Sequence, residues 1–227
     1  MFDYDAFIFD FDGTLYDFRH LPLRLVLSSP LDALKVRAEH SVRRTLKGVY
    51  FKESGMFYRA LGRLLAMRAG FPSDAAALKW YMEFYSTQMV KVLRENYRAR
   101  EFATEVLAKL RDQGKKLAVF SDYDAVKERM KAVGLSPELV DFCFSAGELG
   151  GLKPAQIPFL KIAERLGTEP QKILVIGDRD DTDGEGSRKA NMAFLQIVTH
   201  KTTRSELMNS VHKILSWEAF AKEVLQE

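Results

Sequence analysis

The sequence predicts an α/β protein: a Rossmann-like parallel sheet flanked by helices, with an inserted all-helical subdomain. Two observations indicate this class. Short apolar runs alternate with helical segments from about residue 96 onward, and one earlier apolar run stands before a long helical stretch. Strands separated by helices of this length form βαβ units and a parallel sheet, which the first strand must join across the insertion. We therefore expect an α/β core at residues 1–15 and 96–227 and a helical insertion at 16–95.

The individual elements follow from the apolar pattern and its breaks. The first strand is centred on residues 7–11, and Asp32 can cap the first long helix of the insertion. A second helix, over residues 56–67, ends at Gly70, and a third begins after Ser73 or Asp74. Later strands are predicted at residues 117–120, 142–144, 173–176 and 193–198. The helices of the core are predicted at residues 101–113, 125–133, 155–166 and 206–225.

The composition is that of a globular protein with a full apolar core. The chain has 227 residues, of which 47% are hydrophobic, and a formal net charge of +3. This near-balance of charge argues against nucleic acid as a partner, and no run approaches the ~20 apolar residues of a membrane span. A single cysteine, Cys143, excludes a disulfide within the monomer. We expect a cytoplasmic protein that is a monomer or a weak homodimer.

Two aspartates interrupt the first apolar run. Asp10 and Asp12 are two residues apart, so on a strand their side chains point to the same face. Two carboxylates ~4 Å apart repel by about 4 kcal/mol at an effective dielectric of ~20. A metal ion and a phosphoryl group would offset that repulsion. A turn at Asp12-Gly13 explains the second aspartate but leaves Asp10 unexplained.

Two further polar clusters follow predicted core elements. Ser121-Asp122 comes directly after the strand at 117–120, where it suits either an anion site or a helix cap. Lys153 precedes Pro154, which we place at the first position of a helix. A lysine there can neutralise a phosphoryl oxygen and hold a carboxylate, although solvated loop lysines are common.

The fourth cluster has four aspartates within six residues, from Asp178 to Asp183, after the strand at 173–176. Crowded carboxylates suit a hard cation such as Mg²⁺, and a solvated acidic loop is the alternative. Ligands of open parallel sheets bind beyond the carboxyl ends of the strands, so we expect the four clusters to meet there.

In this order, the clusters resemble the motifs of the haloacid dehalogenase (HAD) superfamily of phosphotransferases. The matching residues are Asp10, Asp12 and Thr14 of the first motif, Ser121 of the second, Lys153-Pro154 of the third, and Gly177-Asp178 with Asp183 of the fourth. The insertion lies where C1-type helical caps lie in that family. Asp122 stands where many members have Asn, and Arg179 where many have Ser.

The resemblance implies a Mg²⁺-dependent phosphatase that acts on a small phosphorylated metabolite. Asp10 would form an aspartyl-phosphate, and Asp12 would protonate the leaving oxygen and then deprotonate water. Ser121 and Lys153 would complete the catalytic set. The metal would be held by Asp10, the backbone carbonyl of Asp12, Asp178, and Asp183 directly or through water. The implied substrate-binding residues are Phe11, Asp12, Thr14, Ser121, Asp122 and Lys153.

Two alternatives stay open: a β-phosphoglucomutase-like sugar-phosphate mutase and a catalytically silent binding protein on the same scaffold. Dehalogenation is disfavoured, because that branch resembles Asp-x-Tyr where this chain has Asp12. We interpret the basic residues of the insertion as outer faces of amphipathic helices. They are Arg43, Arg44, Lys47, Lys52, Arg59, Arg63 and Arg68. Its aromatic residues Trp80, Tyr81, Phe84 and Tyr85 are interpreted as packing residues.

Overall fold

The computed structural model describes residues 3–200, 202–203 and 212–226. Within these residues the strands form one six-stranded parallel sheet, in the order β3-β2-β1-β4-β5-β6. The strands are β1 (Ala6–Asp10), β2 (Lys116–Ser121), β3 (Phe142–Ser145), β4 (Ile173–Gly177), β5 (Ala193–Ile197) and β6 (Lys213–Leu215). The strand order reverses at β1, which lies between β2 and β4, and such a reversal opens a crevice at the carboxyl ends of the strands. The predicted fold class is confirmed.

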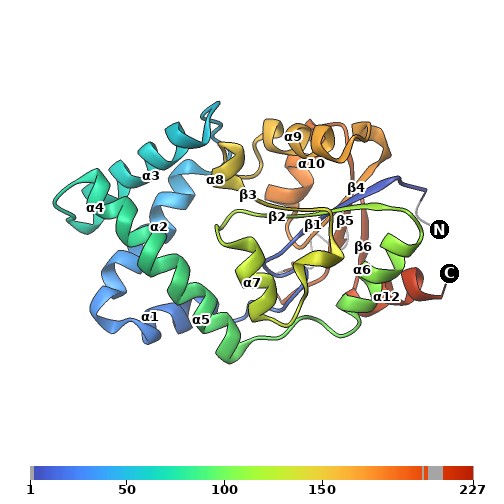
Figure 1. Cartoon of the computed structure of the whole chain (residues 1–227), viewed down its shortest axis with the longest axis horizontal. Coiled ribbons are helices and arrows are strands. Elements are labelled where there is room, and N and C mark those ends of the chain that lie inside the picture. The colour runs from blue at the N-terminus through green and yellow to red at the C-terminus, as the bar shows by residue number, and fades with distance from the viewer. Residues whose placement is uncertain (1–2, 201, 204–211, 227) are drawn as a thin grey trace.

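Helices cover both faces of this sheet, with α9 and α10 on one side and α6, α7 and α12 on the other (Figure 1). Aromatic pairs join the layers: Phe9 of β1 packs against Phe220, and Phe120 of β2 packs edge-on against Phe159. The helices are α6 (Ala103–Asp112), α7 (Val126–Ala132), α8 (Ala146–Leu149), α9 (Gln156–Leu166), α10 (Glu185–Lys189) and α12 (Trp217–Leu225), with short turns η3 (Pro137–Leu139), η4 (Pro170–Lys172) and η5 (Asp180–Gly184). The β1 residues are buried, as a strand covered on both faces requires.

Between β1 and β2 the chain forms a group of helices at the left of Figure 1, which we call the cap helices. They are α1 (Leu21–Ser28), η1 (Pro30–Asp32), α2 (Ala33–Leu46), α3 (Ser54–Ala69), α4 (Asp74–Lys79), η2 (Trp80–Tyr85) and α5 (Ser86–Asn96). The Ser73 side chain caps α4 by accepting from Ala76 N at 3.1 Å, and α3 ends at left-handed Gly70. Buried Tyr81 and Tyr85 confirm that aromatic residues of η2 pack inside this group.

The chain leaves and re-enters the sheet at neighbouring points. Tyr16 forms an antiparallel bridge with Ala99. The Arg100 side chain donates to the carbonyl oxygens of Gly13 and Thr14, at 2.8 and 2.9 Å. The two connections to the cap helices are therefore fastened together beside the end of β1.

The C-terminal end differs from its prediction as one helix over residues 206–225. Residues 204–211 lie outside the described part of the chain. Beyond them, β6 adds a parallel edge strand to β5, and α12 begins only at Trp217. Ser216 sets that start, because its side chain accepts a hydrogen bond from Ala219 N at 3.1 Å.

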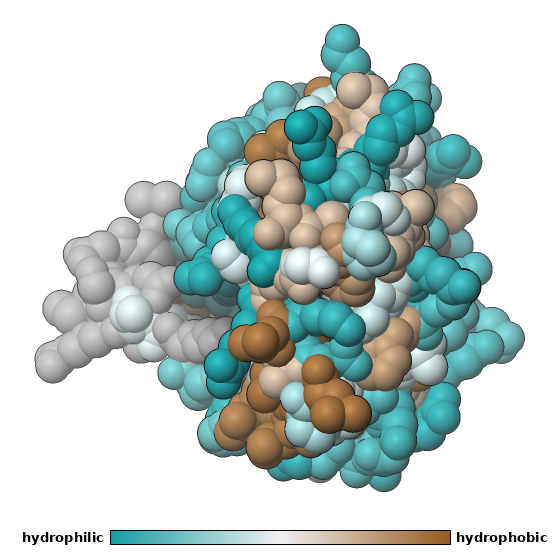
Figure 2. All heavy atoms as spheres, turned by 90° about the vertical axis from the view of Figure 1, so that its left-hand side faces the viewer, coloured by the Kyte–Doolittle hydropathy of each residue, from teal (hydrophilic) through white to brown (hydrophobic). Residues whose placement is uncertain are grey.

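The outer face of the cap helices carries exposed apolar side chains. Leu23, Leu27, Leu31 and Leu34 are all exposed, and they belong to α1, η1 and the first turn of α2. Figure 2 looks at this side of the molecule and shows apolar residues gathered in its lower part. Among the described helices, none combines the length and the hydrophobicity that crossing a bilayer requires.

Candidate active site

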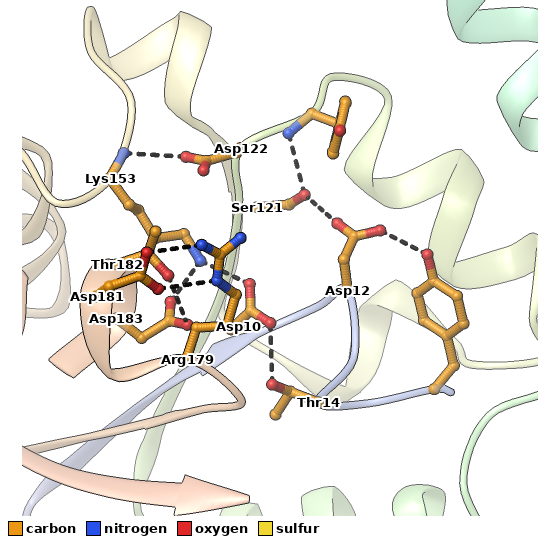
Figure 3. Close-up of polar contacts among 12 residues, drawn as sticks. Asp10, Asp12, Thr14, Ser121, Asp122, Lys153, Arg179, Asp181, Thr182 and Asp183 are labelled. Carbon is orange, nitrogen blue, oxygen red and sulfur yellow. Dashed lines mark hydrogen bonds and ion pairs between the residues drawn. The ribbon is translucent and has the colours of Figure 1, made fainter. Parts of the chain in front are cut away.

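Asp10 ends β1, in the middle of the sheet, and its carboxylate is buried. Its Oδ1 accepts a hydrogen bond from Lys153 Nζ at 2.6 Å, and its Oδ2 accepts one from Thr14 Oγ1 at 2.9 Å (Figure 3). Lys153 Nζ also donates to Asp183 Oδ1 at 2.7 Å. Burial opposes the charge of Lys153, but the ion pairs with Asp10 and Asp183 outweigh it and raise the pKa of the lysine. One charged lysine therefore holds two carboxylates in place.

Asp10, Asp178 and Asp183 form a buried carboxylate cluster. One oxygen of each lies within 4.8 Å of the others. Asp178 directly follows β4, and Asp183 lies in the π-helical turn η5. The Oδ2 atom of Asp178 is buried and accepts no hydrogen bond from any residue that the structure describes. A buried oxygen with open lone pairs among three carboxylates fits a hard cation such as Mg²⁺.

The electrostatics of this cluster favour a cation. Burial raises the pKa of Asp10 to about 7; Lys153 opposes this rise, and Asp183 and Asp12 add to it. Burial, followed by the charges of Asp10 and Asp183, raises the pKa of Asp178 well above its usual range. Crowded carboxylates ionise together only when positive charge compensates them. Lys153 within the cluster and Arg179 beside it supply two positive charges for three carboxylates, so this compensation is incomplete.

Asp12 lies beyond the end of β1, so strand alternation does not set its direction; it has other partners than Asp10, although both residues line the same cavity. β1 ends at Asp10, and the chain turns at Gly13, whose φ is +102°. Asp12 instead accepts hydrogen bonds from Ser121 Oγ at 2.7 Å and from the Tyr16 hydroxyl, and it pairs with Arg129. Burial disfavours its charge, but Arg129, together with the hydrogen bonds from Tyr16 and Ser121, outweighs burial and lowers the pKa of Asp12. Its carboxylate is therefore ionised and held on three sides.

Arg129 is a residue of the site that the motifs missed. It is fully buried in α7, donates to Ser121 Oγ at 2.9 Å and stacks over the Phe11 ring at 4.9 Å. The helical pattern contains a signal for it. Val126, Met130 and Val133 are apolar and buried, and Arg129 stands at the same spacing on that inward face. A charged residue at a core position requires a buried partner, which here is Asp12.

Ser121 and Asp122, at the end of β2, take different parts in the site. Ser121 Oγ bonds to Asp12 and accepts from Tyr123 N at 3.1 Å. Asp122 Oδ1 accepts from the backbone N–H of Lys153 at 3.0 Å. Asp122 therefore anchors the loop that presents Lys153 (Figure 3), in addition to lining the cavity beside the cluster.

The loop around Lys153 differs from the prediction in one respect. Pro154 is not the first residue of a helix, because Ala155 has an extended backbone, with φ −59° and ψ 132°, and α9 begins at Gln156. The Lys153-Pro154 peptide bond is cis. The predicted position of the lysine at the end of the sheet still holds, through the contact of Lys153 with Asp122.

These residues line one side of a cavity of about 300 Å³ between the sheet and the cap helices. The sheet contributes Asp10, Asp12, Asp122, Lys153, Asp178 and Asp183. The cap helices contribute apolar Leu21, Pro22, Leu25 and Met89, and basic Arg43, Arg44 and Lys47. For these three basic residues the interpretation as outer-face side chains is wrong, because α2 turns that side toward the cavity.

Contacts between the cap helices and the sheet bridge this cavity. Arg43 donates to the carbonyl oxygen of Asp122, and Lys47 pairs with Asp181. Farther along, the hydroxyls of Tyr58 and Tyr81 donate to the two oxygens of Asp124, at 2.9 and 2.7 Å. These contacts tie the cap helices to the loops that follow β2 and β4.

Buried aspartates that follow the central strands β1 and β4, joined by Lys153 from the loop before α9, indicate an α/β enzyme. The model of the haloacid dehalogenase-like hydrolase family matches residues 4–191, and the chain belongs to this family of hydrolases. The resemblance inferred from the four motifs is confirmed.

Three similar proteins place the chain further. Protein SUPPRESSOR OF QUENCHING 1, chloroplastic, of Arabidopsis thaliana is 31% identical over 206 residues, which cover 88% of this chain and 18% of that protein. A glyceraldehyde 3-phosphate phosphatase of Methanopyrus kandleri is 27% identical over 202 residues, which cover 85% of this chain and 83% of that protein. The magnesium-bound putative HAD-hydrolase YfnB of Bacillus subtilis shares the fold, with a TM-score of 0.65, 18% identity and 99% of each chain covered. The chain thus spans under a fifth of the plant relative.

Proposed function

We propose that this chain is a Mg²⁺-dependent phosphatase that hydrolyses a small phosphomonoester through an aspartyl-phosphate. The observation that carries the proposal is the buried convergence of Asp10, Asp178, Asp183 and Lys153 at the ends of the central strands. The phosphatase relative from Methanopyrus kandleri, which the chain matches over most of its length, supports the reaction class.

The proposed reaction has two steps. First, a carboxylate oxygen of Asp10 bonds to phosphorus, the bond to the leaving oxygen breaks, and Asp12 gives that oxygen a proton. Second, a water oxygen attacks phosphorus, the bond to Asp10 breaks, and Asp12 takes the proton of the water. The ion pair with Arg129 favours ionised Asp12, the form that the second step needs. The first step requires Asp12 to take up a proton against this preference.

The remaining residues bind and orient. Lys153 would keep Asp10 aligned and place positive charge beside the phosphoryl group, and Ser121 would hold Asp12. A Mg²⁺ ion held by Asp10, Asp178, Asp183 and the Asp12 backbone carbonyl would neutralise charge on the equatorial phosphoryl oxygens. The cap helices over the cavity would limit the access of bulk water to the phosphoryl group.

The test is phosphate release from p-nitrophenyl phosphate and from a panel of phosphorylated metabolites, with Mg²⁺ and with a chelator. Asp10→Asn removes the nucleophile at constant shape, so we expect turnover to fall by at least about 10³-fold, while the unfolding transition persists. Asp112→Asn, at an exposed aspartate ending α6, is the matched control and should keep wild-type turnover. Wild-type activity in Asp10→Asn, or equal activity with the chelator, would contradict the proposal.

A further inference from the structure

The cap side of the cavity carries three basic side chains, and not all of them are needed for contacts between the cap helices and the sheet. Arg43, Arg44 and Lys47 of α2 all line it. Arg43 is buried and already engaged: it pairs with Glu39 and donates to Tyr81 Oη at 2.6 Å. Lys47 pairs with Asp181, which also pairs with Arg179. The side chains of Arg43 and Lys47 therefore both have partners within the protein.

Arg44 differs from both neighbours. It lines the same cavity, yet its side chain forms no hydrogen bond or ion pair with any residue that the structure describes. It is also exposed, so its guanidinium keeps its five N–H donors available in a fixed planar fork. A guanidinium of this kind suits a carboxylate or a phosphate, which it can bind through two parallel hydrogen bonds.

The rest of the lining indicates where the second anionic group of a ligand would bind. The sheet side is occupied by the carboxylates of Asp10, Asp12, Asp178 and Asp183, which would repel a second anion. Leu21, Pro22, Leu25 and Met89 form an apolar wall from α1 and α5. A ligand with its phosphoryl group at Asp10 would lay its carbon chain on this wall. Its far end would then reach α2.

We propose that the substrate is a short-chain phosphomonoester whose leaving group carries a second anionic group, bound by Arg44. This inference rests on the proposed phosphatase function and names the substrate class of that site. The cavity of about 300 Å³ suits a leaving group of a few carbon atoms. Arg44 is thus a specificity residue that acts away from the reacting phosphorus.

The kinetic test compares three phosphate esters with two-carbon leaving groups. Carboxymethyl phosphate and ethane-1,2-diyl bisphosphate carry a second anionic group, whereas the leaving group of 2-hydroxyethyl phosphate is uncharged. The measured quantity is the ratio of kcat/KM for each anionic ester to that for the uncharged one. A charge-assisted bidentate contact predicts that Arg44→Ala lowers this ratio about tenfold to a hundredfold. Comparison of the two anionic esters shows whether Arg44 prefers a carboxylate or a second phosphate.

Arg37→Ala is the matched control, because Arg37 is an exposed arginine of the same helix that does not line the cavity. It should leave the ratio within about twofold of wild type, since a distant surface charge is largely screened. A wild-type enzyme that hydrolyses the uncharged ester as well as both anionic ones would overturn the inference while leaving the phosphatase function standing. An Arg44→Ala effect no larger than that of Arg37→Ala would overturn it equally.

A binding measurement decides the matter if turnover fails. In the Asp10→Asn background, calorimetry would compare carboxymethyl phosphate with 2-hydroxyethyl phosphate in the presence of Mg²⁺. We expect at least about tenfold tighter binding of the anionic ester, and loss of this preference in Asp10→Asn/Arg44→Ala. Equal affinities would overturn the inference. Absence of phosphate release from every ester would contradict the phosphatase function alone.

Discussion

At the scale of single residues, the site depends on a charge pair that holds Asp12. Arg129 is fully buried between the Phe11 and Tyr123 rings, at 4.9 and 5.5 Å from the ring centroids, and pairs with Asp12. Removing one partner of a buried pair costs more than the pair contributes, because the remaining charge is left without compensation. Through this pair, the stability of the fold around α7 depends on the charge of Asp12.

Arg129→Met keeps an unbranched side chain but removes the charge. We expect the free energy of unfolding, measured by urea denaturation, to fall by about 3–5 kcal/mol, because Asp12 is left buried without its partner. Asp12→Asn/Arg129→Met is the companion variant: with neither charge present, it should regain part of that loss. A single variant as stable as the wild type would mean that the pair contributes nothing.

At the scale of elements, the spacing of apolar residues along the sequence predicts which segments form strands and which form helices. The strand that contains Asp10, the strand before Ser121 and the strand before Asp178 are predicted by short apolar runs that helical segments separate. Parallel topology then brings their carboxyl ends together without knowledge of any side-chain contact. The fold class and the acidic residues on the sheet side of the cavity follow from this topology.

Contacts across elements could not be obtained in that way. The direction of Asp12 depends on where β1 ends, which the turn at Gly13 decides. The pairing of Asp12 with Arg129 joins residues 117 positions apart, and no local pattern specifies such a contact. Likewise, the side of α2 that faces the cavity, with Arg44, depends on how that helix packs against the sheet.

The turn after β1 makes a demand that only glycine meets. Gly13 has φ +102°, and a Cβ there would lie 2.4 Å from Asp178 Oδ2 and 2.7 Å from the Phe18 ring. Gly114 also has a left-handed backbone, with φ +74°, but a Cβ there would meet nothing within 4 Å. An alanine at Gly114 would therefore add only backbone strain, whereas an alanine at Gly13 would add the same strain and also displace Asp178.

Gly13→Ala should abolish Mg²⁺-dependent phosphate release and remove the stabilisation by Mg²⁺ in thermal denaturation, since Asp178 must move. Gly114→Ala, its matched control, should cost only about 1–2 kcal/mol of left-handed strain and leave activity unchanged. Wild-type activity in Gly13→Ala would show that the close approach of this turn to Asp178 is not needed.

At the scale of the whole molecule, uncompensated negative charge is concentrated at one buried point of a nearly neutral chain. Burial raises the pKa of Asp10 to about 7 and also raises that of Asp183, with Lys153 opposing both shifts. An acid with a raised pKa holds more protons in the folded than in the unfolded state between its unfolded pKa, about 3.9, and its folded value. Stability without metal therefore falls as the pH rises through that window.

Mg²⁺ should reverse this dependence, because it binds the deprotonated carboxylates. We expect the melting temperature in chelator to decrease from about pH 5 to about pH 7.5, and the increase caused by Mg²⁺ to be larger at the higher pH. Asp12 does not contribute to this change, since Arg129 lowers its pKa and keeps it ionised throughout the range. Asp178→Asn removes one carboxylate of the cluster and should flatten both trends. If Mg²⁺ raised the melting temperature equally at both pH values, or more at the lower one, the cluster would not be the site at which the cation replaces protons.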